Sequence, residues 1–265
     1  MDSDTGRAFK TAQNPALGAA GRVALSLAVL LAVWFAVSIF ADPRLLPSPA
    51  AVGTALLREV ASGDLPFHLA MTLMRVAAAF VVAMAIGAAI GIALGLRPRL
   101  DRFFDAWVVL WLNVPALVII VLAYIWFGLN EAAAIGAVAV NKIPNVIVTM
   151  REGARALDPS LDEMARLFRL SPRRRLTEVI APQLQPYFAA AARSGIALIW
   201  KIVLVVELLG RSNGVGFQIN LHFQLFDVAM ILAYTLAFVA VMLALELALV
   251  QPWERRARRW RGAHA

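Results

Sequence analysis

DPSLDEMARLFRLSPRRRLTEVIAP, residues 158–182, is a polar and strongly basic stretch in a chain whose neighbouring segments are long and apolar. Asp158 can cap a helix that begins with Pro159, because its carboxylate can accept hydrogen bonds from N–H groups that the first turn leaves unpaired. Asp162 and Glu163 add negative charge near the start of this helix, where the helix dipole favours it. The stretch therefore predicts a short helix in a loop that joins membrane-spanning segments.

The predicted loop helix has one apolar face. The residues that recur at spacings of three, four and seven are Leu161, Met164, Ala165 and Phe168. Such a stripe is typical of a helix that lies in a groove of a partner. A second helix is expected to begin at Pro172. Pro182 is expected to kink or end that helix, since proline lacks the backbone N–H that a helix interior needs.

Outward from this loop, the chain has the composition of a membrane protein. Of its 265 residues, 61% are hydrophobic and 16% are charged, and the mean hydropathy is +0.75. A transmembrane helix needs about 20 predominantly apolar residues. The segments that approach or exceed this length are residues 23–41, 71–96, 106–127, 132–150, 187–209 and 228–250. We therefore predict an all-α polytopic membrane protein with six transmembrane helices in one domain, residues 23–250.

The positions of Lys and Arg predict the orientation of these helices. Basic residues gather in the N-terminal tail (1–22), after the second span, in the loop at 151–186 and in the C-terminal tail (251–265). The opposite side carries only Arg44, Arg58 and Arg211. Because cytoplasmic loops carry an excess of Lys and Arg, we expect both tails and the loop at 151–186 to be cytoplasmic.

Composition and motifs exclude several function classes. The net charge of +8 lies at membrane ends, where it orients helices and meets lipid headgroups, so we expect no nucleic-acid binding. The chain has no cysteine, its three histidines show no metal-ligand spacing, and no catalytic triad or carboxylate pair is apparent. Glycines 210, 214 and 216 lack the strand and lysine of a phosphate-binding loop. We expect no metal site, no catalytic site and no nucleotide site in this chain.

Charged residues within the apolar segments are costly and need partners. Lys142 and Lys201 lie near the middle of their spans, where a charge costs about 3 kcal/mol on insertion scales. One interpretation is structural pairing with a carboxylate on another helix, and Glu207 and Glu246 are the candidates. The other is a path for an anionic solute, lined by the two lysines and Glu207. Arg75 is expected to extend to the membrane interface and to have a structural role.

Small and polar residues mark two further spans. Gly87, Gly91 and Gly95 repeat every four residues and predict close packing of the second span against a neighbouring helix. Asn141 and Asn145 lie one turn apart and predict a polar lining in the fourth span. These asparagines join the lysines as candidate translocation-path residues.

The loop at 151–186 resembles a family pattern. Permease subunits of bacterial ABC importers carry E-A-A-x-x-x-G, then nine residues, then I-x-L-P, and this sequence keeps that spacing from Glu163 to Pro182. Glu163, Ala165 and Pro182 match. Arg169 stands where the pattern has glycine, so the sequence does not support the tight turn usual there. The stretches LPSP (46–49) and WKIVLVVELLGRSNGVG (200–216) are similar to the nitrate, sulfonate and taurine branch.

The resemblance implies a fold and a set of partners. It implies a type I ABC importer permease, a homodimer in the bacterial cytoplasmic (inner) membrane, in contact with lipid, with two ABC ATPase subunits and a soluble substrate-binding protein. ATP is then bound and hydrolysed by the partner ATPase, so the chain itself is not an enzyme and needs no cofactor. The implied coupling helix has as its residues Asp162, Glu163, Met164, Ala165, Arg166, Phe168 and Arg169.

The solute and one rival class stay open at this stage. Small anions such as nitrate, sulfonates or taurine come first, and an aromatic carboxylate or a thiamine-precursor pyrimidine is the alternative within the same class. A secondary transporter or channel that works without ATP also suits six spans and buried lysines. Such a protein would not need a loop helix of importer spacing.

Overall fold

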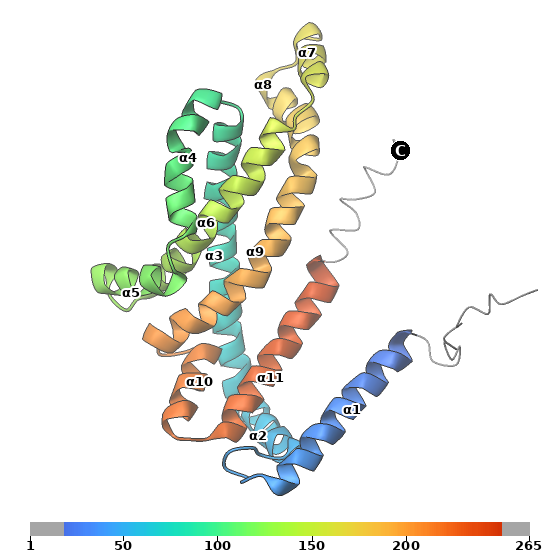
Figure 1. Cartoon of the computed structure of the whole chain (residues 1–265), viewed down its shortest axis with the longest axis vertical. Helices are drawn as coiled ribbons and strands as arrows, with labels where there is room; N and C mark the ends of the chain where they lie inside the picture. The colour runs from blue at the N-terminus through green and yellow to red at the C-terminus, as the bar shows by residue number, and fades with distance from the viewer. Residues whose placement is uncertain (1–18, 251–265) are drawn as a thin grey trace, which may run out of the picture.

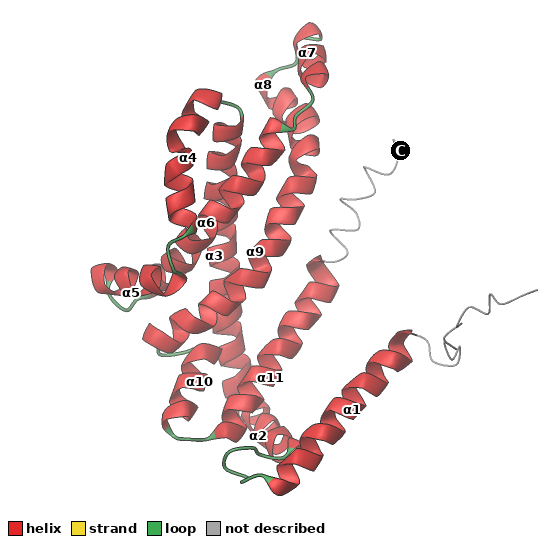
Figure 2. Ribbon diagram, viewed as in Figure 1, coloured by secondary structure: helices red, strands yellow, loops and turns green. Residues whose placement is uncertain are grey.

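The computed structural model describes residues 19–250, and all regular structure in that range is helical (Figures 1 and 2). The predicted all-α class is confirmed. The predicted tails fall largely or wholly on residues 1–18 and 251–265, outside the described part. The helices are α1 (Ala19–Phe40), α2 (Pro49–Ser62), α3 (Asp64–Gly95), α4 (Pro98–Leu112), α5 (Ala116–Phe127), α6 (Glu131–Arg155), α7 (Pro159–Leu167), α8 (Pro172–Arg174), α9 (Ala181–Gly210), α10 (Val215–Gln224) and α11 (Val228–Leu245), with π-helical turns at Arg175–Ile180 and Glu246–Val250.

Five helices in the described range are long and apolar enough to cross a membrane, and a bent pair makes up to six. The bent pair is α4 with α5, whose axes differ by 91°. The prediction that residues 106–127 form one continuous helix is therefore wrong, because the chain bends between α4 and α5. Pro115 explains the break, because proline disfavours helical backbone at the residue before it and cannot donate a hydrogen bond to the preceding turn. The sequence carried this signal inside the predicted span.

The fifth predicted span is part of a longer rod. From Pro172 to Gly210 the chain is helical throughout, with a π-helical turn at Arg175–Ile180. The expectation that Pro182 ends or kinks the helix is only partly met, because α9 continues through it. Pro182 lies in the first turn of α9, directly after the widened π turn, where the missing N–H is most easily accommodated.

The centre of the molecule is the contact between α3 and α6, the most extensive between any two described helices. The glycines of α3 permit it. A Cβ added at Gly87 would lie 2.6 Å from the Cβ of Val146, and one added at Gly91 would lie 2.6 Å from the carbonyl oxygen of Ile147. At Gly95 the distance to the Cβ of Ala154 would also be 2.6 Å. These distances leave no room for a side chain, so the two backbones approach as small-residue stripes allow.

The remaining helices surround this pair. The helix α9 packs against both α3 and α6, and α11 packs against α2 and α10. Arg151 of α6 is buried and bonds to Asp101 (3.1 Å) and Asp105 (2.7 Å), which holds α4 beside α6. The helix α1 stands apart and has no buried residue in its apolar window, although Trp34 donates a hydrogen bond to the carbonyl of Pro47 (3.1 Å).

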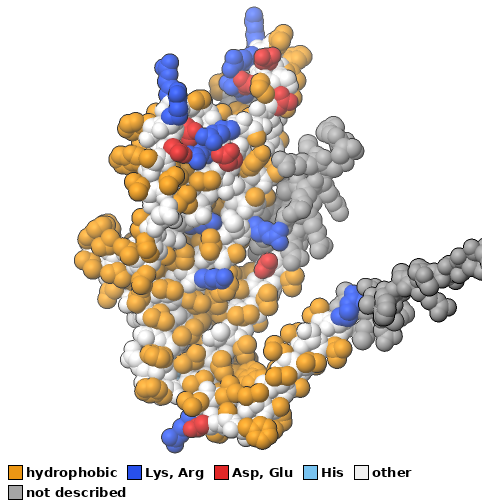
Figure 3. Space-filling view, viewed as in Figure 1, with side chains coloured by type: hydrophobic (Ala, Val, Ile, Leu, Met, Phe, Trp, Pro, Cys, Tyr) orange, Lys and Arg blue, Asp and Glu red, His pale blue; other side chains and the backbone are white. Residues whose placement is uncertain are grey.

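The elongated molecule has two distinct ends (Figure 1). We name them the α7 end, formed by α7, α8 and the start of α4, and the α2 end, formed by α2, the first half of α3, the loop between α9 and α10, and the turn between α10 and α11. Lys and Arg side chains gather at the α7 end, and apolar side chains cover most of the surface between the ends (Figure 3). This distribution matches a helix bundle surrounded by lipid.

Candidate functional site

The predicted loop helix is present as α7 at one tip of the molecule. Asp158 caps it by accepting hydrogen bonds from the backbone N–H and the hydroxyl of Ser160, both 2.8 Å. These two bonds lower the pKa of the Asp158 carboxyl. The carboxylate of Asp162 bonds to Arg175 (2.5 Å) and to Arg166 (2.9 Å), which ties α7 to the following π-helical turn. The helix start predicted at Asp158 and Pro159 is confirmed.

The apolar residues of the α7 stripe differ in exposure, because one is buried and others face outward. Ala165 is 1% exposed, whereas Met164 is 41% and Phe168 is 73% exposed. Leu167, which the stripe did not include, is 83% exposed. Glu163 is also exposed. The helix therefore anchors itself through Ala165 and presents large apolar side chains outward.

The turn after α7 forms although its residue is arginine. Arg169 has φ of +49°, in the left-handed region that glycine normally occupies. The N–H of Leu170 donates to the carbonyl of Ala165 (2.9 Å), as in a Schellman C-cap. The turn that the motif did not support at this position is therefore present. The side chain of Arg169 makes no hydrogen bond or ion pair with the described residues, so it has gained no contact within this part of the chain that would favour this conformation.

Lys142 is buried in the centre of the molecule without a carboxylate partner. It is 1% exposed, and its ammonium donates a long hydrogen bond (3.3 Å) to the hydroxyl of Ser194 on α9. No Asp or Glu in the described part pairs with it. The neighbouring Asn141 and Asn145 are partly buried on the same helix. Of these three residues, Lys142 contacts α9, through Ser194.

Glu207 does not pair with either lysine. It is completely buried and bonds to Arg75 (2.6 Å), and Arg75 is itself only 1% exposed. The same arginine bonds to Glu131 at the start of α6 (2.7 Å) and to the carbonyl of Asn213 (2.9 Å). The expectations that Arg75 reaches the interface and that Glu207 pairs with a lysine are both wrong. Helical spacing could not reveal this network, because its members come from three helices and a loop.

The Arg75 network also holds the loop between α9 and α10. The second oxygen of Glu207 accepts hydrogen bonds from the hydroxyl of Thr72 and the N–H of Gly216, both 2.9 Å. The N–H of Gly214 donates to the imidazole of His68 (2.9 Å). Gly214 has φ of +109°, and an added Cβ there would lie 2.3 Å from the Glu207 carboxyl carbon. Glycine is therefore needed where the loop covers the buried carboxylate.

Lys201 is exposed on α9 and has its ammonium 5.4 Å from the ring centre of Trp200. It lines a groove together with Glu246, which directly follows α11. The predicted structural pair of Lys201 with Glu246 is absent, since the two side chains do not form an ion pair. Neither has another ion-pair partner among the described residues.

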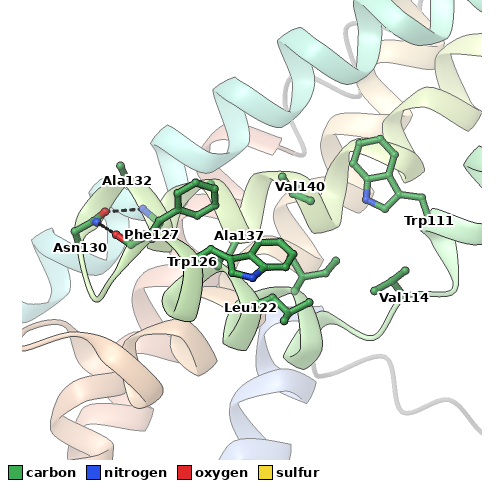
Figure 4. Close-up of a pocket in the computed structure, with 13 residues that line it drawn as sticks. Trp111, Val114, Leu122, Trp126, Phe127, Asn130, Ala132, Ala137 and Val140 are labelled. Carbon is green, nitrogen blue, oxygen red and sulfur yellow. Dashed lines mark hydrogen bonds between the residues drawn. The ribbon is translucent and has the colours of Figure 1, made fainter.

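A large groove lies at the bend between α4 and α5, against α6 (Figure 4). Its volume is about 650 Å³, and Trp111 and Trp126 are among its apolar lining. Its polar lining residue, Asn130, is engaged, because it caps α6 at Ala133 (2.8 Å) and donates to the carbonyl of Phe127 (2.6 Å). This groove suits an apolar occupant. No group of three His, Cys, Asp or Glu side chains that could hold a metal occurs in the described range.

Comparison with known proteins places these features in a family. Residues 83–250 match the family described as binding-protein-dependent transport system inner membrane component. The Escherichia coli protein named as aliphatic sulfonates transport permease protein SsuC is 37% identical over 190 residues, which cover 71% of this chain and 72% of SsuC. The Escherichia coli taurine transport system permease protein TauC is 29% identical over 89% of this chain and 88% of TauC.

Solved structures share the fold. The structure described as an inward-facing conformation of the MetNI methionine ABC transporter aligns with a TM-score of 0.59 at 18% identity, over 71% of this chain and 92% of that one. An amino acid ABC transporter aligns with a TM-score of 0.55 at 20% identity, over 76% and 98%. The helical arrangement, the spacing of the loop at α7 and the sequence matches agree. The chain belongs to the family of binding-protein-dependent transport system inner membrane components, the membrane permeases of ABC importers.

Proposed function

We propose that this chain is the membrane subunit of an ATP-driven importer for a small organic sulfonate or a related anion. The 37% identity to a relative named for aliphatic sulfonates, together with the match to a taurine permease, supports this solute class. A further relative, from Synechococcus elongatus, is named for bicarbonate and is 28% identical over 56% of this chain. All three names specify anions or zwitterions that carry an anionic head.

The proposed setting is the bacterial cytoplasmic (inner) membrane, with the α7 end and both tails in the cytoplasm. The concentration of Lys and Arg at the α7 end supports this orientation. A soluble binding protein delivers the solute at the α2 end. Two copies of the chain assemble as a homodimer, and two separate ATPase subunits bind and hydrolyse ATP at the α7 end.

The observation that carries the coupling role is the exposed apolar tip of α7. Leu167 and Phe168 are more than two-thirds exposed at the extreme end of the molecule, where lipid does not cover them. Such side chains are typical of an interface with another protein. Ala165 and the pairs made by Asp162 hold α7 rigidly to the rod that becomes α9, so a push on α7 is transmitted to that helix.

The proposed mechanism follows from this connection. ATP binding closes the ATPase pair, moves the two α7 helices towards each other and switches a central path from inward-facing to outward-facing. The solute enters from the binding protein, and hydrolysis resets the path. The candidate path residues are Asn141, Lys142, Asn145 and Lys201. The Lys142 ammonium contacts α9 at Ser194. Ser194 lies seven residues before Lys201, which is about 10 Å along the helix. The two ammonium groups therefore lie one after the other along α9.

Charge reversal on α7 tests the coupling role. In the complex with its ATPase, Glu163→Arg is expected to leave membrane insertion unchanged and to reduce copurification of the ATPase by more than about tenfold, or to uncouple hydrolysis from transport. The matched control is Asp64→Arg, an exposed first-turn carboxylate at the α2 end, which should leave copurification unchanged. Wild-type, solute-stimulated hydrolysis in Glu163→Arg would contradict the proposal. Uptake by the permease alone, without ATPase, would favour a secondary transporter or channel.

A further inference from the structure

The groove between α9 and α11 has charged lining residues and lies between two helices long and apolar enough to cross a membrane. It encloses about 220 Å³, and its charged lining residues are Arg193, Lys201 and Glu246. The rest of its lining is apolar, including Trp200 and Met242. The larger groove beside α5, by contrast, has no charged lining residue. A charged groove among membrane helices is a candidate solute site, because such charges are too costly to be kept without a role.

Two opposite charges in this groove are present but do not meet. Lys201 contacts the face of Trp200, and Glu246 has no hydrogen bond or ion pair with the described residues. Both side chains are exposed in the described part of the chain, so each can meet a group that enters the groove. One cationic group and one anionic group therefore face a shared space.

The floor of the groove is rigid and apolar. Trp200 packs against Phe238 with ring centres 5.5 Å apart, and Phe238 is 1% exposed. Met242 is also buried and belongs to the same apolar cluster of α9 and α11. The charged groups are therefore mounted on two helices with a fixed apolar surface between them. Such a surface suits a short hydrocarbon spacer.

The position of Lys201 favours a solute over a lipid headgroup. It lies nine residues before the end of α9 at Gly210, about 14 Å along the helix, and twenty residues after its start. Lipid headgroups lie at the membrane surfaces rather than at this depth. The groove volume corresponds to roughly seven water molecules, which limits the occupant to a small solute.

We propose that this groove binds a small zwitterion, with its anionic head at Lys201, its protonated amine at Glu246 and its short apolar spacer over Trp200 and Met242. The proposal rests on the function proposed above and deepens it, because it selects an aminoalkyl sulfonate over a simple inorganic anion. Arg193 also lines the groove. A lone anion would bind at Lys201 but would not use the Glu246 carboxylate.

The test measures binding to the purified permease–ATPase complex in detergent without ATP. The probes are 2-aminoethanesulfonate and ethanesulfonate, which differ by the amine. We expect the amine to improve affinity by about tenfold or more, the value of one charge-assisted hydrogen bond. In Glu246→Gln this advantage should disappear, and in Lys201→Met both probes should lose affinity. Arg58→Met, which removes an exposed positive charge on α2 outside the groove, should bind both probes as the wild type does.

A charge exchange distinguishes a solute site from a structural pair. Lys201→Glu and Glu246→Lys should each abolish binding of 2-aminoethanesulfonate, and the double exchange should restore it, because a zwitterion can bind in the reverse orientation. Equal affinity of the two probes for the wild type, or unchanged binding in Glu246→Gln, would overturn the proposal. Phosphatidylethanolamine tests the lipid alternative. If the probes bind only after this lipid is removed, and if the lipid abolishes their binding both with Lys201 present and in Lys201→Met, the groove is a lipid site. That outcome would also overturn the proposal.

The outcome for the site is separable from the outcome for the importer function. Normal ATP-driven uptake of sulfonates with unchanged rates in Lys201→Met and Glu246→Gln would overturn the groove and leave the proposed function intact. Binding with the expected probe preference but without ATP-driven uptake in the intact complex would overturn the proposed function and support the groove as a binding site.

Discussion

The two ends of the molecule differ in the burial and pairing of charged residues such as Arg75 and Arg169. At the α2 end, Arg75 and Glu207 are almost completely buried and bonded to each other, and the neighbouring loop donates hydrogen bonds to the same carboxylate. At the α7 end, the side chain of Arg169 is exposed and makes no hydrogen bond or ion pair with the described residues. Its backbone is strained, and Phe168 beside it faces outward. The α2 end is complete within one chain, whereas the α7 end has the properties of a surface that meets a partner.

Removing the central arginine of the α2 end should have the largest effect. Arg75→Met leaves the buried Glu207 carboxylate without a counter-charge, and we expect a loss of about 3–5 kcal/mol in unfolding free energy. Melting temperature and yield of the purified permease measure this loss. The control is Glu131→Gln, which is partly exposed and leaves the Arg75–Glu207 pair intact, so its effect should be much smaller.

A double replacement sharpens this prediction. Arg75→Met combined with Glu207→Met removes both buried charges, and part of the lost stability should return because no charge is left unpaired. If Arg75→Met alone melts within a degree or two of the wild type, the α2 end does not depend on this network and the comparison between the two ends fails.

The strained turn at the α7 end should respond in the opposite direction. Arg169→Gly relieves a left-handed conformation that costs a non-glycine residue about 1–2 kcal/mol, so we expect a gain of about 1 kcal/mol in local or global stability. Protease resistance of the loop after α7 and the melting temperature measure it. Arg174→Gly is the control, because Arg174 has φ of −65° and glycine should destabilise that helical position by up to about 1 kcal/mol.

This result would also decide why the arginine is there. A more stable Arg169→Gly permease with weaker ATPase copurification would assign Arg169 a contact with the partner. A less stable Arg169→Gly permease would show that the arginine makes an unrecognised contact within the chain, and the turn would then not be a source of strain.

The smallest effect is expected between the two ends, at Lys142. Because no carboxylate in the described part pairs with Lys142, Lys142→Met leaves no charge stranded and loses one long hydrogen bond to Ser194. We expect the unfolding free energy to change by less than about 1 kcal/mol, with methionine equal or better. A loss as large as that of Arg75→Met would mean that a carboxylate from another chain pairs with Lys142 in the assembled complex.

The predictable features are those that depend on neighbours in sequence. Asp158 and Pro159 start α7 as expected, because capping is a contact between residues one or two positions apart. The spacing of Gly87, Gly91 and Gly95 indicated a face for close packing, but the sequence did not say that α6 is the helix packed there. Pro115 breaks the third span, and this was missed because hydropathy averages over such a residue.

The sequence by itself determined the helical class, the membrane setting and the family, since these depend on apolar length, charge placement and the motif around Glu163. Only the tertiary structure decided that Glu207 pairs with Arg75, that Lys142 meets Ser194, and that Lys201 and Glu246 share a groove without pairing. The physical reason is that helical periodicity specifies which residues share a face. It does not specify which distant face lies opposite, and the energy of a buried charge depends on that opposite face.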